Sequence, residues 1–261
     1  MRRSVIFLAL CAASAIAQSS LNAPLVGVSR DAKNALHPVY GVAGNFVVRG
    51  GVQDDVLDWA FAGHGGFAKT NAELLVLGAD GTIVQRQAAR GGVVLSPSYA
   101  FFPETGELWH GGTHTARVLR IEPAAIGGKV IAHGPDARGI TLAVCRTNHL
   151  WLLTFDLAAG TLLREAAPGG AIGELACPPA GSAAFMMIRD RMLLVTGDEI
   201  VIQERTGEER RIAIPGGATA EVHRFGEDTV QIELRGAPSH LLRFTSPGEE
   251  FYELPAAEVR Q

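Results

Sequence analysis

A short segment that begins and ends in glycine recurs along this chain and constrains its fold more than any other feature. Gly160–Gly170 (GTLLREAAPGG) and Gly207–Gly217 (GEERRIAIPGG) align without a gap, sharing the first glycine, an arginine, the proline and the glycine pair. Gly81–Gly92 (GTIVQRQAARGG) matches with one insertion, and Gly248 begins a fourth copy that ends at Pro255. Recurrence with a period of about 40–50 residues is typical of propellers and other repeat architectures.

Each copy contains a short apolar strand, a turn with Asp-Gly or Ala-Gly, and a second strand. These turns supply the positive φ that tight hairpins need. Two further tripeptides, Leu95-Ser96-Pro97 and Ala176-Cys177-Pro178, lie about two periods apart, as expected if they occupy the same position in different repeats. A single hairpin cannot bury its own apolar face. We therefore predict an all-β fold, a β-propeller of five or six short blades, with a tandem β-sandwich as the alternative.

The predicted outer hairpins of the blades cover residues 25–44, 73–92, 115–134, 150–170, 199–217 and 240–255. Thr229–Arg235 alternates between apolar residues on one face and Gln231, Glu233 and Arg235 on the other, the period of a half-buried strand. Asp54–Ala62 could begin a helix capped by Asp54, but it ends at a glycine with too few turns, and a strand is predicted there.

The N-terminus predicts export. Arg2 and Arg3 precede an apolar stretch, and Ala15-Ile16-Ala17 has the small-x-small pattern of a signal-peptidase site. We expect a signal peptide at 1–17 and a single β-propeller domain at 18–261, located in the periplasm or secreted. A lipoprotein signal at Cys11 is the alternative, although Leu10 stands where a small residue is required. We expect no membrane span in the mature chain, since the apolar stretch is shorter than about 20 residues.

The charge pattern argues against nucleic acid as a partner. The whole chain has 23 basic and 27 acidic residues, and loss of Arg2 and Arg3 leaves 21 against 27, a mature charge of −6. Lysine occurs only at positions 33, 69 and 129. A surface that binds phosphates needs clustered Lys and Arg, and the sequence contains no such run.

The alternation of Ser-Pro, apolar strand, Asp/Ala-Gly-Thr turn and Gly-Gly resembles the propeller repeats of exported bacterial YVTN-type, TolB-like and quinoprotein-like families. The opening Pro24–Gly44 is similar to exported, uncharacterised proteins of soil bacteria. This resemblance covers Pro24 to Pro255 and implies a propeller fold. It transfers no site residue, because the Trp-Asp signature is missing and Trp59, Trp109 and Trp151 share no register.

His110-Gly-Gly-Thr-His114 is the sequence's candidate metal site. Two imidazoles four residues apart can converge across a glycine turn, with Glu107 or His64 as a third ligand. The ordinary alternative is a turn with two surface histidines, and we expect no metal. No P-loop, dinucleotide fingerprint or Gly-x-Ser-x-Gly elbow occurs, so no cofactor is expected.

The acidic cluster Asp54-Asp55-x-x-Asp58 is compatible with a calcium site or with carboxylates that act on glycosides. Most acids of this chain fall in predicted hairpin turns, where solvated carboxylates are ordinary. The catalytic residues are therefore left unknown.

Cys145 and Cys177 remain after signal removal. One hypothesis is a disulfide between neighbouring blades, since an even pair in an oxidising compartment permits one, but face-packed sheets lie about 10 Å apart and the sequence leaves the bridge undecided. In the repeat alignment Cys177 takes the place of Ser96, and Cys145 lies near the position of Ala68. The alternative is two buried thiols that pack as small apolar residues.

The sequence favours an exported, non-catalytic propeller that binds or scaffolds an unknown protein or glycan. The alternative is a secreted hydrolase or lyase acting on sugars or lactones at the central funnel. Acids and histidines that converge at the channel would favour the enzyme, whereas an apolar channel would favour the binding protein.

Overall fold

The computed structural model describes residues 23–111, 116–136, 139–169, 172–173, 177, 185–188, 191–196, 198–204, 206–214, 220–234, 238–245 and 248–255. The predicted signal peptide (1–17) and His114 lie outside these residues. Strands dominate, as predicted, and the described helix α2 (Pro123–Ile126) has a single turn. Within the described part of the chain, no helix has the length and apolarity needed to cross a membrane.

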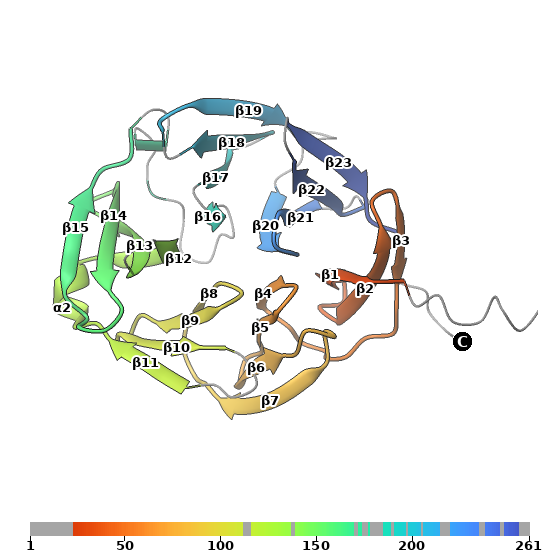
Figure 1. Ribbon diagram of the computed structural model, residues 1–261, viewed down its shortest axis with the longest axis horizontal. Helices are drawn as coiled ribbons and strands as arrows, with labels where there is room; N and C mark the ends of the chain where they lie inside the picture. Colours follow the sequence, from red (N-terminus) through yellow and green to blue (C-terminus); the bar gives the residue numbers. More distant parts are fainter. Residues whose placement is uncertain are drawn as a thin grey trace, which may run out of the picture.

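The strands form antiparallel meanders around a central axis, in the arrangement of a β-propeller (Figure 1). The N-terminal sheet contains β1 (Leu25–Arg30), β2 (Leu36–Val42) and β3 (Asn45–Val48). The next meander contains β4 (Asp58–Ala62), β5 (Gly65–Lys69), β6 (Glu73–Leu77) and β7 (Ile83–Ala88). It is followed by β8 (Val94–Leu95), β9 (Tyr99–Phe102), β10 (Glu107–His110) and β11 (Ala116–Arg120).

Beyond α2, three further meanders complete the ring. The first contains β12 (Lys129–Asp136), β13 (Gly139–Arg146), β14 (His149–Asp156) and β15 (Leu162–Ala166). The second contains β16 (Phe185–Ile188), β17 (Arg191–Thr196), β18 (Glu199–Glu204) and β19 (Glu209–Ala213). The last contains β20 (Ala220–Arg224), β21 (Thr229–Leu234), β22 (His240–Phe244) and β23 (Glu249–Glu253).

Hydrogen bonding corrects the predicted number of blades. The sequence predicted five or six separate blades, whereas the described strands form four sheets with four or more strands and one sheet with three. The difference arises where the ring closes, because β20 pairs in parallel with β4 at Arg224 and Ala60. This bridge merges the last meander and the first into one eight-stranded sheet. The ring around one axis also excludes the tandem sandwich.

The repeated glycine marks the turn before an outer strand. Gly81, Gly160 and Gly207 have φ of 77°, 70° and 90° and precede β7, β15 and β19. These are conformations that a residue with a Cβ adopts only with strain. The sequence repeat therefore corresponds to the same structural position in three meanders.

Two details of the predicted repeat are wrong. Residues 115–134 form no hairpin, because they contain β11, the turn of α2 and β12, which belongs to the next sheet. The turn signals around Pro123 and Gly127 mark this connection. Ser96 and Cys177 are also not equivalent, since Ser96 follows the inner strand β8 and Cys177 lies between β15 and β16.

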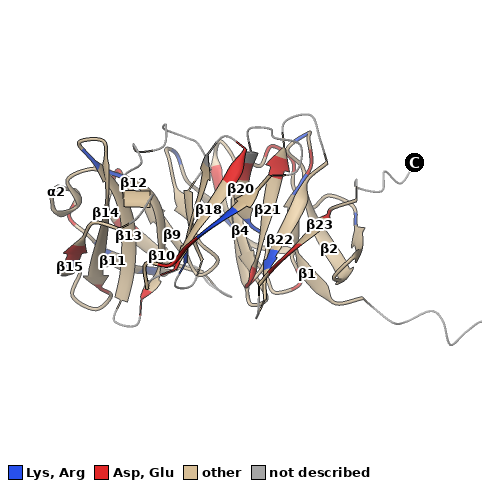
Figure 2. Cartoon of the chain, turned by 90° about the horizontal axis from the view of Figure 1, so that it is seen from above, with Lys and Arg blue, Asp and Glu red and all other residues tan. Residues whose placement is uncertain are grey.

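Apolar residues fill the spaces between neighbouring sheets. One cluster joins the β8–β11 and β12–β15 sheets through Phe101, Leu142 and their neighbours, and another joins the β16–β19 meander to β20–β23 through Leu193 and Ile232. Each sheet is thus covered on both faces, and all five residues of β5 are buried. Figure 2 shows the resulting disc from the side, with acidic and basic segments interspersed.

The N-terminal sheet lies against the junction of the last meander and the first. Gly27 of β1 meets Phe225, where an added Cβ would lie 2.3 Å from the carbonyl oxygen. The indole nitrogen of Trp59 donates to the Val28 carbonyl at 3.1 Å. These contacts bring residues of β1 and β4 together with Phe225, which directly follows β20.

Cys145 is the next-to-last residue of β13, and Cys177 lies in the connection between β15 and β16. The two form a disulfide with Cα atoms 5.7 Å apart, within the usual range for such a bond. Closing a loop of 32 residues restricts the unfolded chain and stabilises the fold by about 3–4 kcal/mol on the chain-entropy model.

Candidate functional site

Strand pairing places four polar side chains on one face of β20 and β21. Glu221 lies opposite Glu233, and His223 lies opposite Gln231. Residues two apart on a strand share a face, so the four form a square. Like charges directly opposite one another destabilise a sheet, and the pair Glu221 and Glu233 therefore requires a compensating cation.

Arg30 at the end of β1 supplies that cation. Its guanidinium donates to Oε2 of Glu233 at 2.6 Å and to Oε2 of Glu221 at 3.2 Å. It also donates to the backbone carbonyl of Leu57 at 2.8 Å and lies 5.1 Å from the centre of the Trp59 ring. The Arg30 side chain is only 10% exposed, so these contacts replace most of its hydration.

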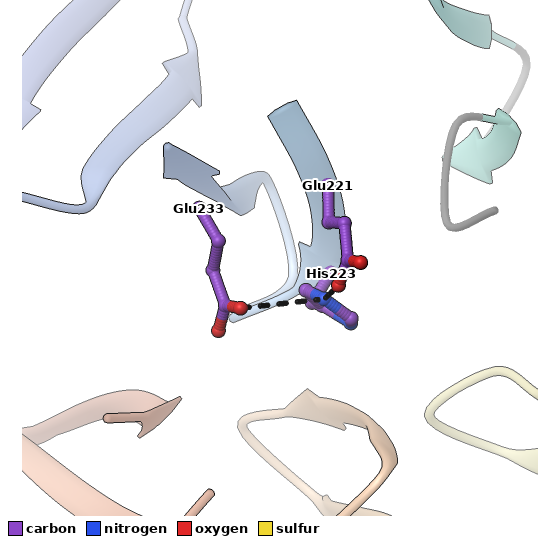
Figure 3. Close-up of side chains that lie close together, drawn as sticks. All are labelled: Glu221, His223 and Glu233. Atoms are coloured by element: carbon purple, nitrogen blue, oxygen red, sulfur yellow. Dashed lines mark ion pairs between the residues drawn. The ribbon is translucent and has the colours of Figure 1, made fainter. Parts of the chain in front are cut away.

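His223 connects the same carboxylates to β4. Its Nδ1 lies 3.1 Å from Oδ1 of Asp58, and its ring stacks on Trp59 with centroids 3.9 Å apart. Its Nε2 lies 3.4 Å from Glu221 and 4.0 Å from Glu233 but makes no hydrogen bond. Figure 3 shows the side chains of Glu221, His223 and Glu233 directed toward one another. We call Arg30, Asp58, Glu221, His223 and Glu233 the closure cluster.

Opposite charges shift the acid–base equilibria of the closure cluster. The adjacent His223 and the guanidinium of Arg30 outweigh burial and lower the pKa of Glu221 to about 2. Burial disfavours the charged form of His223, but Asp58, Glu221 and Glu233 outweigh it and raise its pKa. Burial also opposes the charge of Arg30, yet Glu233 and Glu221 raise its pKa. The charged forms therefore support one another.

Four residues of the closure cluster, Arg30, Asp58, Glu221 and His223, line a cavity of about 680 Å³ in the middle of the ring. The first strands of all five four-stranded meanders, β4, β8, β12, β16 and β20, contribute residues to its wall. The lining also includes apolar residues such as Val130 and Met186, together with Glu104 and Lys129. A concave space of this volume with a few convergent polar groups is typical of a ligand site.

Of the candidate site residues predicted from the sequence, only some lie at the cavity. Asp58 belongs to the closure cluster, whereas Asp54 and Asp55 are exposed and do not line the cavity. His110 is exposed, and its predicted partner His114 is outside the described residues. Among the residues that the structure describes, the group able to share one metal ion is Glu221, His223 and Glu233, without His64, Glu107 or His110.

Sequence reasoning missed Arg30, Glu221, His223 and Glu233. The alternation of β21 was recognised, but its polar face was expected to be in solvent, whereas Gln231 is fully buried. In a propeller both faces of a sheet are covered by neighbouring sheets. A polar face on a strand near the axis could therefore have indicated a buried polar cluster. The pairing with Arg30, about 200 residues away in the sequence, had no local signal.

No family model matches this sequence, and no curated protein sequence matches it. Similar solved structures include a protein of unknown function from Bacteroides caccae, at 11% identity and a TM-score of 0.49, covering 89% of this chain and 92% of that one. Virginiamycin B lyase from Staphylococcus aureus has 14% identity and a TM-score of 0.41, with 90% and 88% covered.

A third similar structure is PorZ, a surface component of the type-IX secretion system of Porphyromonas gingivalis, at 13% identity and a TM-score of 0.44. The alignment covers 89% of this chain but 32% of PorZ. The predicted membership in a YVTN, TolB or quinoprotein-like group of soil bacteria finds no sequence match and stays a prediction.

His133 on β12 makes stability depend on pH. It is buried in the cavity wall, its Nε2 lies 2.9 Å from the Val94 carbonyl, and its Nδ1 has no hydrogen bond. Burial lowers its pKa to about 4, despite the opposing hydrogen bond. The unfolded chain, with an ordinary pKa of 6.5, takes up this proton first as pH falls. Stability from neutral His133 is therefore complete above pH 6.5 and is lost toward pH 4.

We predict that lowering the pH from 7 to 4.5 costs about 2 kcal/mol of unfolding free energy through His133 alone. The variant His133→Gln should lose this part of the pH dependence, measured by urea unfolding at both values. The exposed His149→Gln serves as the control and should keep the wild-type slope. Equal pH slopes in wild type and His133→Gln would contradict the assignment.

Proposed function

We propose that this protein is an exported binding protein whose central cavity takes a short glycan without converting it. The observation that carries this proposal is the cavity of about 680 Å³ with Asp58, Glu221 and other residues of the closure cluster in its wall. Ligand sites for small molecules span about 300–1,000 Å³. A folded protein does not enter a space of this size, so a short polar chain is the better fit.

The exposed carboxylates give the cavity its chemistry. The side chains of Asp58 and Glu221 are 43% and 52% exposed, while His223 behind them is 2% exposed. Carboxylate oxygens accept hydrogen bonds from hydroxyl groups, and the apolar residues of the lining suit the C–H face of a sugar ring. The buried partners fix the two acceptors, which reduces the entropy lost on binding.

A second candidate is a hydrolase or lyase that acts on sugars or lactones. The observation that favours it is the pair of Asp58 and His223, since a carboxylate on Nδ1 orients an imidazole for proton transfer at Nε2. Against it, Nε2 is buried and adjoins Glu221, so a substrate must displace that carboxylate to reach it.

Calorimetry with cellobiose, xylobiose, chitobiose and maltotriose tests the binding proposal. We expect at least one of these sugars to bind, with about tenfold weaker affinity in Asp58→Asn, because one charged hydrogen-bond acceptor is lost. Glu73→Gln removes an equal charge outside the cavity and should leave the affinity unchanged.

Absence of binding to all four sugars, or equal affinity in wild type and Asp58→Asn, would contradict the glycan proposal. Cleavage of the sugars by wild type, lost in both Asp58→Asn and His223→Gln, would favour the enzyme instead.

Export to an oxidising compartment is part of the proposal. It is supported by Arg2-Arg3, the apolar stretch and Ala15-Ile16-Ala17, and by the proximity of Cys145 and Cys177. The intact mass of the exported protein should correspond to a chain that starts at Gln18 and lacks the two thiol hydrogens of the disulfide. A mass that retains Arg2 and Arg3, or two thiols that can be labelled after denaturation, would contradict it.

A further inference from the structure

The Nε2 atom of His223 is a buried polar atom without a hydrogen bond, and it faces two carboxylates. The side chain is 2% exposed. With Nδ1 held at Asp58, the second ring nitrogen is directed at Glu221 and Glu233, at 3.4 and 4.0 Å. Buried polar atoms are rarely left without a partner. When the imidazole is neutral and keeps its proton on Nδ1, the lone pair of Nε2 faces two carboxylate oxygens, and a bound cation can take the place of the proton there.

We propose that Glu221, His223 and Glu233 bind one divalent first-row transition ion of the Zn²⁺ class at the wall of the central cavity. One ligand atom from each side chain lies within 4.8 Å of the other two. Zinc binds imidazole nitrogen and carboxylate oxygen at about 2.0–2.2 Å, so small side-chain rotations bring the three atoms to one ion. Figure 3 shows that they come from the paired strands β20 and β21.

The charge of the closure cluster fits a dication. Asp58, Glu221 and Glu233 contribute three negative charges, and Arg30 contributes one positive charge. With a neutral imidazole, which is the form that binds metals, the cluster has a net charge of −2. A divalent ion brings this to zero. Glu221 is half-exposed toward the cavity, so water or a ligand can complete the coordination.

The surroundings of His223 fit the role of a metal ligand. Histidines that bind metals usually donate the other ring N–H to a carboxylate, which fixes the ring, and Asp58 lies at that position. Stacking on Trp59 holds the ring plane. Gln231 donates to Oε1 of Glu233 at 3.2 Å and orients that carboxylate. Three of the surrounding groups are therefore already in place for a rigid site.

Zn²⁺ alone is the probe, so the outcome is independent of any glycan. The mature protein is treated with a chelator, dialysed and titrated with Zn²⁺ by calorimetry. We expect one ion per chain with a Kd of about 10 μM or below. Glu221→Gln should weaken binding by about tenfold or more, and its half-exposed position allows the variant to fold. Mg²⁺ should not compete, since it keeps its waters and prefers oxygen ligands.

Glu104→Gln is the matched control, because Glu104 is an exposed acid of the same cavity wall outside the closure cluster. It should bind Zn²⁺ as wild type does, as should His110→Gln combined with His114→Gln. The proposal is overturned if Zn²⁺ does not bind, if Glu221→Gln and Glu104→Gln weaken binding equally, or if the double histidine variant abolishes it.

Discussion

Every sheet in a closed ring packs against a neighbour on both faces, so a polar face on an inner strand has to be paired within the protein. On β20 and β21 two like charges have to be compensated, because Glu221 and Glu233 lie directly opposite one another. Arg30, from a different sheet, lies between them and also binds the Leu57 carbonyl. One guanidinium thus connects the N-terminal sheet, the first meander and the last, where the ring closes.

The burial of Arg30 determines how much its ion pairs contribute to the stability of the fold. Exposed ion pairs stabilise proteins by about 0–1 kcal/mol, and Arg86 with Glu73, both well exposed, is such a pair. Removing one partner of a buried pair costs about 3–5 kcal/mol, because the other charge is left without compensation. Arg30 and Glu233 are 10% and 20% exposed, so their pairing lies nearer the second case. The ring is therefore closed by two kinds of contact: the ion pairs of Arg30 and the apolar contacts around Phe225 and Leu241.

The sequence was sufficient to predict the local architecture. The glycine repeat located three outer turns, and the alternation of Thr229–Arg235 located β21, because both depend on neighbouring residues. It was not sufficient for the closure, since the β20–β4 bridge and the contacts of Arg30 join distant parts of the chain. Asp58 was noticed for its acidic neighbours Asp54 and Asp55, yet its partner is His223. A local cluster of acids cannot indicate a partner that only the ring brings near.

The most direct test of this account is a double-mutant cycle on Arg30→Met and Glu233→Gln, measured as unfolding free energies in urea. The account predicts a coupling free energy of about 2 kcal/mol or more, as expected for charged groups that share a buried hydrogen bond. The same cycle on Arg86→Met and Glu73→Gln should give less than about 0.5 kcal/mol. Equal coupling in the two cycles would contradict the claim that Arg30 closes the ring.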